Sequence, residues 1–315
     1  MNGTLARLMR QPWIFSFAAA LAVWLVTILY TGGHGAGAIL TAALSFATFT
    51  IIVGLGQMMV ITTGPGNVDL SIPATITLSG VVAMKVMDEQ SARMLLGVAA
   101  ALGASVLVGV FNYILIRLLR IPPIIATLSS SFLILSTAIS YGRGIRIKPP
   151  EPLAEFATAQ VFGIPIMAFA VLGISVVMAL VLSRTLYGRS VLAIGQNSRA
   201  AWLAGLNVDR TRFLTYVLSA FLAGICGLLL SGFSRGAALN MGEEFLLASI
   251  ATVVIGGTSV AGGNANVPGI WGAALFMYLL VTMLNTFGAS AGIRLILTGL
   301  MIIGVIVAAG GEEQR

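Results

Sequence analysis

The residues with the clearest chemical potential lie in a break between two apolar runs, TTGPGNVDLSIPATITLSG at residues 62–80. This stretch holds a carboxylate, Asp69, and a Gly-Pro-Gly-Asn sequence that interrupts helical structure. The backbone groups freed by such a break are costly to expose to lipid, because lipid offers them no hydrogen-bond partner. We therefore expect the break to be covered by protein or to line water.

Two interpretations of this break remain open. In the first, Asp69 or Ser71 caps the next helix, whose first turn tolerates Pro73 because that position needs no amide hydrogen bond. In the second, Asn67 and Asp69 lie near the cytoplasmic end of a transport path and form a gate or support a cytoplasmic loop. A similar stretch, GGTSVAGGNANVPG at residues 256–269, hints at an internal structural repeat.

The remaining inventory of reactive residues argues against catalysis by this chain. There is one histidine, His34, in a Gly-rich turn, and one cysteine, Cys226, inside an apolar run. A single histidine does not supply the ligands of a zinc or haem site, and a single cysteine excludes an internal disulfide and is expected to be buried. No Gly-rich phosphate loop with its lysine is present. We predict that the chain is not an enzyme, binds no metal or cofactor and does not hydrolyse ATP by itself.

The composition is that of a membrane protein. Hydrophobic residues make up 58% of the 315 residues and charged residues 9%, whereas soluble domains carry about 25% charged residues. The apolar runs are too long for the strands of a β-barrel, so the predicted fold class is an all-α polytopic membrane protein. The net charge of +7 comes from basic residues scattered between apolar runs, which is typical of membrane flanks and excludes nucleic acid as the expected partner.

Hydropathy and helix breakers predict ten transmembrane spans and place both termini on the same side of the membrane. Ten lysine and arginine residues fall on the side of the termini and seven on the other, which favours cytoplasmic termini. The predicted spans lie near residues 13–30, 37–61, 72–87, 93–116, 122–141, 163–183, 213–232, 245–259, 268–287 and 292–310.

The long cytoplasmic loop at residues 184–212 is predicted to contain a short helix. Asn197 or Ser198 is placed to cap its first amides, and Gly205 to end it in a left-handed turn. In the same way, Asp209 is placed to cap the membrane helix that follows.

This short helix is amphipathic, and the pattern allows two roles. It fits a groove on a cytoplasmic partner, with Trp202 and Leu203 as apolar anchors and Arg199 at the rim. It equally fits a helix lying on the inner leaflet, where tryptophan and arginine are also common. The residues assigned to this element are Asn197, Ser198, Arg199, Trp202, Leu203 and Gly205.

Four motifs along residues 40–305 resemble the ribose-type permeases of bacterial ABC sugar importers, which are related to branched-chain amino acid permeases. They are GLGQMMVITTGPGNVDLSIPATITLSG, IPPIIATLSSSFLI, YGRSVLAIGQNSRAAWLAGLNVDRTRFLTYVLSAFLAGICGLLL and ASIATVVIGGTSVAGGNANVPGIWGAAL, in the order seen in that family. The resemblance implies a single permease domain over residues 1–315, similar in fold to the vitamin B12 importer permease. It also implies a multi-pass protein of the bacterial inner membrane.

The resemblance further implies a set of partners. These are an ABC ATPase subunit that carries ATP and Mg, a second permease, and a periplasmic substrate-binding protein. The loop at residues 184–212 then becomes the cytoplasmic coupling loop, and its short helix becomes the coupling helix. Such permeases usually read GGIDLSVG where this chain has GNVDLSIP. This departure leaves a homodimer and a heterodimer of permeases equally open.

The polar residues of the membrane runs suit an uncharged substrate. A sugar is expected to cross between small, amide and hydroxyl side chains, although such residues also hold membrane helices together. Three alternatives stay open: a permease for branched-chain amino acids, one for nucleosides, and an ion-coupled secondary carrier with Asp69 as its ion site. The residues assigned to the path or its gate are Gln57, Asn67, Asp69, Asn112 and Asn285.

Overall fold

The computed structural model describes residues 12–144, 148–290, 292–294, 296–300 and 303, and this part of the chain is an all-α polytopic membrane protein. Two apolar helices are too short to cross the hydrocarbon core, which is about 30 Å thick. They are α4 (Ile72–Met87) and α12 (Phe245–Ile255). Seven others are long and apolar enough to cross it: α2 (Pro12–Tyr30), α3 (Ala36–Thr62), α5 (Met94–Arg117), α6 (Pro123–Tyr141), α8 (Ile166–Arg184), α11 (Val208–Phe233) and α13 (Val267–Thr286).

These nine helices coincide with the first nine predicted spans. Of the tenth, 292–310, residues 292–294, 296–300 and 303 are helical, and the rest lies outside the described residues. The count of ten therefore stays a prediction. The largest difference between a predicted and an observed boundary is at α11, which starts five residues before the predicted position. It starts there because the Asn207 side chain caps the helix by accepting a hydrogen bond from the amide of Arg210 (2.9 Å).

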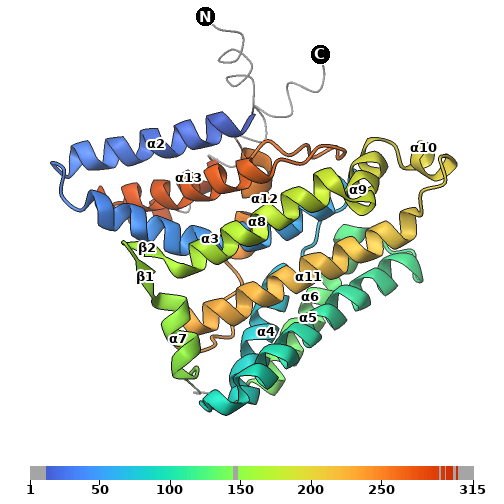
Figure 1. The fold of residues 1–315 in the computed structure, drawn as a ribbon, viewed down its shortest axis with the longest axis horizontal. Coiled ribbons are helices and arrows are strands. Elements are labelled where there is room, and N and C mark those ends of the chain that lie inside the picture. The colour runs from blue at the N-terminus through green and yellow to red at the C-terminus, as the bar shows by residue number, and fades with distance from the viewer. Residues whose placement is uncertain (1–11, 145–147, 291, 295, 301–302, 304–315) are drawn as a thin grey trace, which may run out of the picture.

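The connections between the helices alternate between two ends of the molecule (Figure 1). One end, at the right of the view, carries α9 (Leu186–Gln196) and α10 (Ser198–Leu203), and we call it the docking end. The opposite end carries the 3-10 helix η1 (Ser91–Arg93), the helix α7 (Glu151–Thr158) and a hairpin. The strands of this hairpin, β1 (Gln160–Val161) and β2 (Ile164–Pro165), are antiparallel, with Val161 opposite Ile164.

The centre of the fold is formed by α3 and α11. Every residue of α3 from Ala47 to Thr62 is buried. Gly56 lets α11 approach closely, because a Cβ at this position would lie 3.1 Å from the Cα of Ser219. Small residues of this kind drive helix packing in membranes, where helices gain nothing from burying apolar surface alone. Cys226 of α11 has no exposed surface, which confirms that it is a buried, unpaired cysteine.

Candidate functional site

Three segments that are far apart in the sequence meet at the docking end. The amide of Gly263, in the break before α13, donates a hydrogen bond to the carbonyl of Thr62 at the end of α3 (2.9 Å). Gly195, near the end of α9, packs so closely against both residues that a Cβ would overlap the Thr62 carbonyl and the Gly263 amide. Gly262 packs against Gly64 in the same place. We call Thr62, Gly64, Gly195, Gly262 and Gly263 the glycine junction; through it, α9 touches both breaks.

The helix α10 follows the glycine junction directly and projects from the molecule (Figure 1). Asn197 caps it by accepting the amide of Ala200 (2.9 Å), and Gly205 ends it with φ +87°. Both features of the predicted short helix are therefore confirmed. Trp202 is 62% exposed and Leu203 70%, and Arg199 is exposed beside them. The side chains of Trp202 and Leu203 form an apolar surface that none of the described residues covers, as a docking surface requires.

The prediction that Asp209 caps the following helix is wrong. Asn207 takes that place, because its side chain is the one that reaches the free amides at the start of α11. Asp209 lies two residues later and turns toward α5. There it pairs with Arg117 (2.9 Å) and accepts a hydrogen bond from the Tyr113 hydroxyl (3.3 Å).

Asp69 lies inside a buried hydrogen-bond network at the start of α4. One carboxylate oxygen accepts hydrogen bonds from the amide and the hydroxyl of Ser71 (3.0 and 2.6 Å). The other oxygen accepts a hydrogen bond from the hydroxyl of Ser219 (2.8 Å). The amide of Asp69 donates to Gln57 (3.2 Å), and the side-chain amide of Asn112 donates to Ser71 (2.7 Å). The network joins α3, α4, α5 and α11.

This geometry contradicts the interpretation that Asp69 or Ser71 caps the first turn of α4. Ser71 is the N-cap residue of α4, but its side chain makes no capping hydrogen bond. Asp69 instead binds the amide of Ser71 itself, one position before the helix. Asp69 is 1% exposed, and within the described residues no basic side chain pairs with it. A buried carboxylate with both oxygens hydrogen-bonded is typical of a structural anchor.

The structure brings together four of the five residues assigned to the path. Gln57 and Asn112 are fully buried, and the Gln57 side-chain nitrogen has no partner among the described residues. Asn67 is 5% exposed, donates to the carbonyl of Gly64 (3.1 Å) and lines a cavity. Asn285 does not join them, because it is exposed near the end of α13. Gln57, Asp69 and Asn112 thus lie between helices, and none of them lines the cavity that Asn67 lines.

One exposed face of α6 carries serines between apolar residues, and the sequence reasoning noted Ser129 without recognising this face. Ser129, Ser136 and Ser140 are exposed and recur at helical spacing, so they share one face of the helix. The opposite face of α6 packs on α4 and α5. The spacing of seven and four residues between these serines could have revealed the face in the sequence. A hydropathy profile does not show it, because the residues between the serines are apolar.

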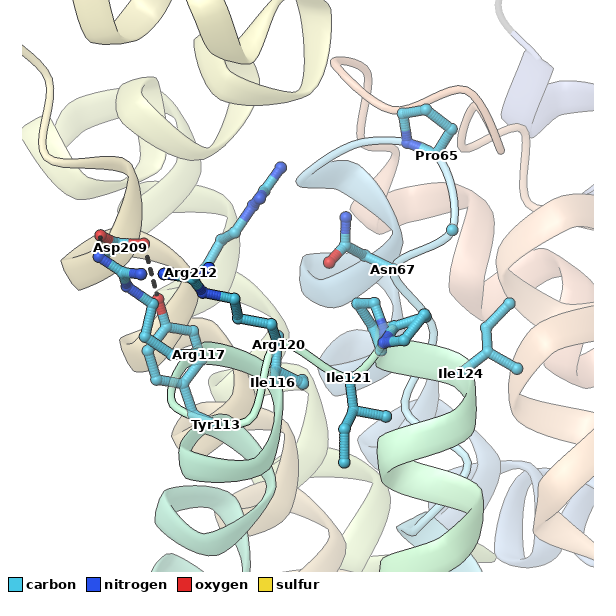
Figure 2. A pocket seen from close by; sticks show the side chains of 13 residues that line it. Pro65, Asn67, Tyr113, Ile116, Arg117, Arg120, Ile121, Ile124, Asp209 and Arg212 are labelled. Atoms are coloured by element: carbon cyan, nitrogen blue, oxygen red, sulfur yellow. Dashed lines mark hydrogen bonds and ion pairs between the residues drawn. The ribbon is translucent and has the colours of Figure 1, made fainter.

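A cavity of about 660 Å³ opens at the docking end, beside the first membrane break. Figure 2 shows that its lining comes from separate elements: Arg117 from the end of α5, Arg120 from the turn between α5 and α6, Arg212 from α11 and Asn67 from the break before α4. Asp209 also lines it. Three arginines and one aspartate give this cavity a positive balance.

Comparison with known proteins identifies the family. Residues 38–306 match the family described as branched-chain amino acid transport system / permease component. The chain is 29% identical over 309 residues to the autoinducer 2 import system permease protein LsrC of Enterobacter sp. (strain 638), covering 98% of this chain and 89% of that protein. It is 31% identical over 261 residues to the fructose import permease protein FrcC of Rhizobium meliloti, covering 80% and 72%.

A third relative, also 31% identical, is the probable ABC transporter permease protein y4mJ of Sinorhizobium fredii (strain NBRC 101917 / NGR234), with 84% of this chain and 79% of that protein covered. No solved structure matches the chain. The family match covers most of the chain and includes both breaks and the α9–α10 segment. This chain therefore belongs to the branched-chain amino acid transport system permease family, as a multi-pass permease of the inner membrane.

Proposed function

We propose that this chain forms the translocation path of a binding-protein-dependent ABC importer for a monosaccharide-type sugar. ATP hydrolysis takes place in a separate ATPase subunit, which carries ATP and Mg. The observation that carries the proposal is the glycine junction, where α9 contacts both membrane breaks. A partner that binds α10 is thereby linked, through close backbone contacts, to the end of α3 and to the break before α13.

The coupling residues follow from this arrangement. Trp202 and Leu203 insert into a groove of the ATPase, and Arg199 lies at the rim of the contact. Asn197 fixes the start of the coupling helix and Gly205 its end, while Ser198 lies in its first turn. Closure of two ATPase subunits around ATP moves the two coupling helices, and the permease pair then alternates between outward-open and inward-open states.

In the proposed orientation, the docking end and both termini lie in the cytoplasm. The cluster of arginines between residues 184 and 212 supports this orientation, because arginine is enriched on the cytoplasmic side of the membrane. The opposite end, with α7 and the β1–β2 hairpin, faces the periplasm and receives the substrate from a binding protein.

The sugar path lies between two permease subunits, along the serine face of α6. The hydroxyls of Ser129, Ser136 and Ser140 make no hydrogen bond within the described residues. The same face also carries the exposed Ile125, Phe132 and Leu133, and such a mixture of hydroxyl and apolar groups suits a contact between two permease subunits beside a sugar path. The second subunit is an identical chain or a paralogue. In this arrangement Gln57, Asp69 and Asn112 support the path from behind α6, and Asn67 lies at its cytoplasmic end.

The names of the relatives favour a sugar, since one imports fructose and another autoinducer 2. Branched-chain amino acids are the second candidate, because the family description names them. An ion-coupled carrier is disfavoured by the burial of Asp69, whose oxygens are already occupied by Ser71 and Ser219.

Two measurements test the proposal. The first is gentle affinity purification from the native host, followed by mass spectrometry of the attached chains; an ATPase is expected, and a second permease would identify a heterodimer. Trp202→Ala with Arg199→Glu should abolish recovery of the ATPase while the protein stays in the membrane. Phe162→Ala with Arg143→Glu, at the opposite end, is the matched control. Normal ATPase recovery with the first pair would refute the coupling-helix assignment.

The second measurement is uptake by membrane vesicles that contain the complete transporter and its binding protein. Radiolabelled fructose and leucine are compared, with and without ATP. ATP-dependent uptake of the sugar alone supports the proposal, whereas uptake of leucine alone replaces it with the amino acid permease.

A further inference from the structure

We propose that the cavity between α5, α6, α11 and the first membrane break binds a phosphate group. This is a binding site separate from the coupling helix and from the serine face of α6. It does not rest on the proposed function, because its evidence is the charge and geometry of the cavity alone.

The charges that line the cavity are not balanced. Asp209 is already neutralised by its ion pair with Arg117 (2.9 Å) and by the hydrogen bond from Tyr113 (3.3 Å). Arg120 and Arg212 form no ion pair within the described residues. Two guanidinium groups therefore remain without an anion on one cavity wall, and the guanidinium fork matches phosphate oxygens in geometry.

Arg212 shows the clearest sign of an absent partner. Its Nε is buried and has no hydrogen-bond partner among the described residues, while a terminal nitrogen donates only a long bond to the carbonyl of Thr63 (3.4 Å). A buried donor on a charged group costs more free energy to leave unsatisfied than a neutral one. A phosphate oxygen in the cavity would supply the acceptor.

Arg120 occupies a backbone position where an arginine is unfavourable. Its φ is +56°, in the left-handed region, where glycine is tolerated and other residues cost about 1 kcal/mol or more. The turn is held by the amide of Ile121, which donates to the carbonyl of Leu115 (3.4 Å). Glycine would relieve the backbone at this position, whereas the arginine places a further guanidinium group at the cavity.

The start of α6 adds a third favourable element. Its N-terminal residues Pro122, Pro123 and Ile124 line the cavity, and no side chain caps the helix. Pro122 and Pro123 have no backbone N–H, so the free amides of this first turn are those of Ile124 and Ile125. These amides and the positive end of the dipole of a 19-residue helix attract anions. Arginines from two helices and this helix start thus surround one volume.

Two sources can supply such a phosphate: the headgroup of an anionic phospholipid, and a soluble phosphate compound in the water at the docking end. Leu118 and Leu119 next to the cavity are 75% and 58% exposed, as expected for residues that contact acyl chains. The shared chemistry is the phosphate, and the experiment separates the sources.

The test uses the full chain with the partners that stay bound to it. In the lipid arm, the protein is purified from nanodiscs with equal amounts of phosphatidylglycerol and phosphatidylcholine, and the retained lipids are counted by native mass spectrometry. In the soluble arm, inorganic phosphate is added at constant ionic strength and the shift in thermal unfolding is measured.

The variants are Arg120→Gly and Arg212→Gln, with Arg184→Gln as a control arginine at the same end, outside the cavity. Arg120→Gly relieves the left-handed backbone, so this variant is expected to keep the fold, and its thermal unfolding without ligand checks this. We expect each variant to weaken binding about tenfold, which is about 1.4 kcal/mol, and the control to leave it unchanged.

The outcomes decide between the sources. Preferential retention of phosphatidylglycerol that both variants reduce identifies a lipid site. Stabilisation by inorganic phosphate that both variants abolish identifies a soluble ligand. If wild-type protein shows neither effect, or if the variants behave like Arg184→Gln, the proposed phosphate site is wrong.

Discussion

At the scale of single residues, the main question is why an apolar chain keeps a carboxylate at Asp69. Its two oxygens hold the segment before α4 against α11, through Ser71 on one side and Ser219 on the other. Because the carboxylate is buried and its oxygens are occupied, it acts as an anchor for the broken backbone. A stabilising role and a gating role make different predictions for the same substitution.

Asp69→Ala should lower the free energy of unfolding by about 3 kcal/mol, because three donors lose their acceptor in a buried site. Asp69→Asn should lower it less, since the amide oxygen still accepts one hydrogen bond. The control is Asp88→Asn, an exposed residue with φ +49°, a conformation that asparagine tolerates. Thermal unfolding of the purified proteins measures the difference. An Asp69→Ala protein that melts like the wild type yet fails to transport would identify Asp69 as a gate.

At the scale of elements, the two membrane breaks end and start helices at one place. Thr62 and Gly64 follow α3, Gly262 and Gly263 precede α13, and α9 closes on both through Gly195. A contact between backbones admits no side chain, so the three segments move together or separate altogether. We therefore expect the glycine junction to transmit a movement of α10 to the membrane helices.

Gly195→Ala should uncouple the transporter. Its Cβ overlaps the carbonyl of Thr62, so α9 must shift away from the breaks; overpacking of this kind costs about 1–3 kcal/mol. We expect the ATPase to remain bound while ATP-dependent uptake falls about tenfold, which is the effect of about 1.4 kcal/mol. Gly173→Ala in α8 is the control, because a Cβ there meets nothing within 4 Å. Undiminished uptake by Gly195→Ala would show that motion reaches the helices by another route.

At the scale of the whole molecule, the chain is one half of a proposed pair. The face of α6 that carries Ser129, Ser136 and Ser140 is exposed in the single chain, and only the opposite face is packed. A second subunit placed along this face would enclose a path with hydroxyls on its wall. The helix α8 differs, since its exposed residues, such as Leu172 and Val177, include no hydroxyl before Ser183 and present a surface suited to lipid.

Ser136→Cys should react with a charged, membrane-impermeant thiol reagent about tenfold faster than Leu172→Cys, because a thiol forms the reactive thiolate in water and not in lipid. The native Cys226 has no exposed surface and gives no background. Modification of Ser136→Cys should also block uptake by filling the path. Equal, slow labelling at both positions would place the α6 face in lipid and exclude it from the path.

The sequence alone determined the membrane class, the places of nine helices, both breaks and the two ends of α10. These features depend on local properties: runs of apolar residues, glycine and proline breaks, and the capping asparagine and glycine of a short helix. Each is readable within one or two helical turns of chain.

Only the tertiary structure decided which distant residues meet. Asp209 was expected to cap its own helix, but it pairs with Arg117, 92 residues earlier in the chain. Asp69 was expected near a gate or as a cap, and it is buried against Ser219, 150 residues away. Gly195 shows no sign in sequence of its contact with Thr62 and Gly263. Contacts of this range depend on how the helices pack, and the local spacing of residues carries no record of that packing.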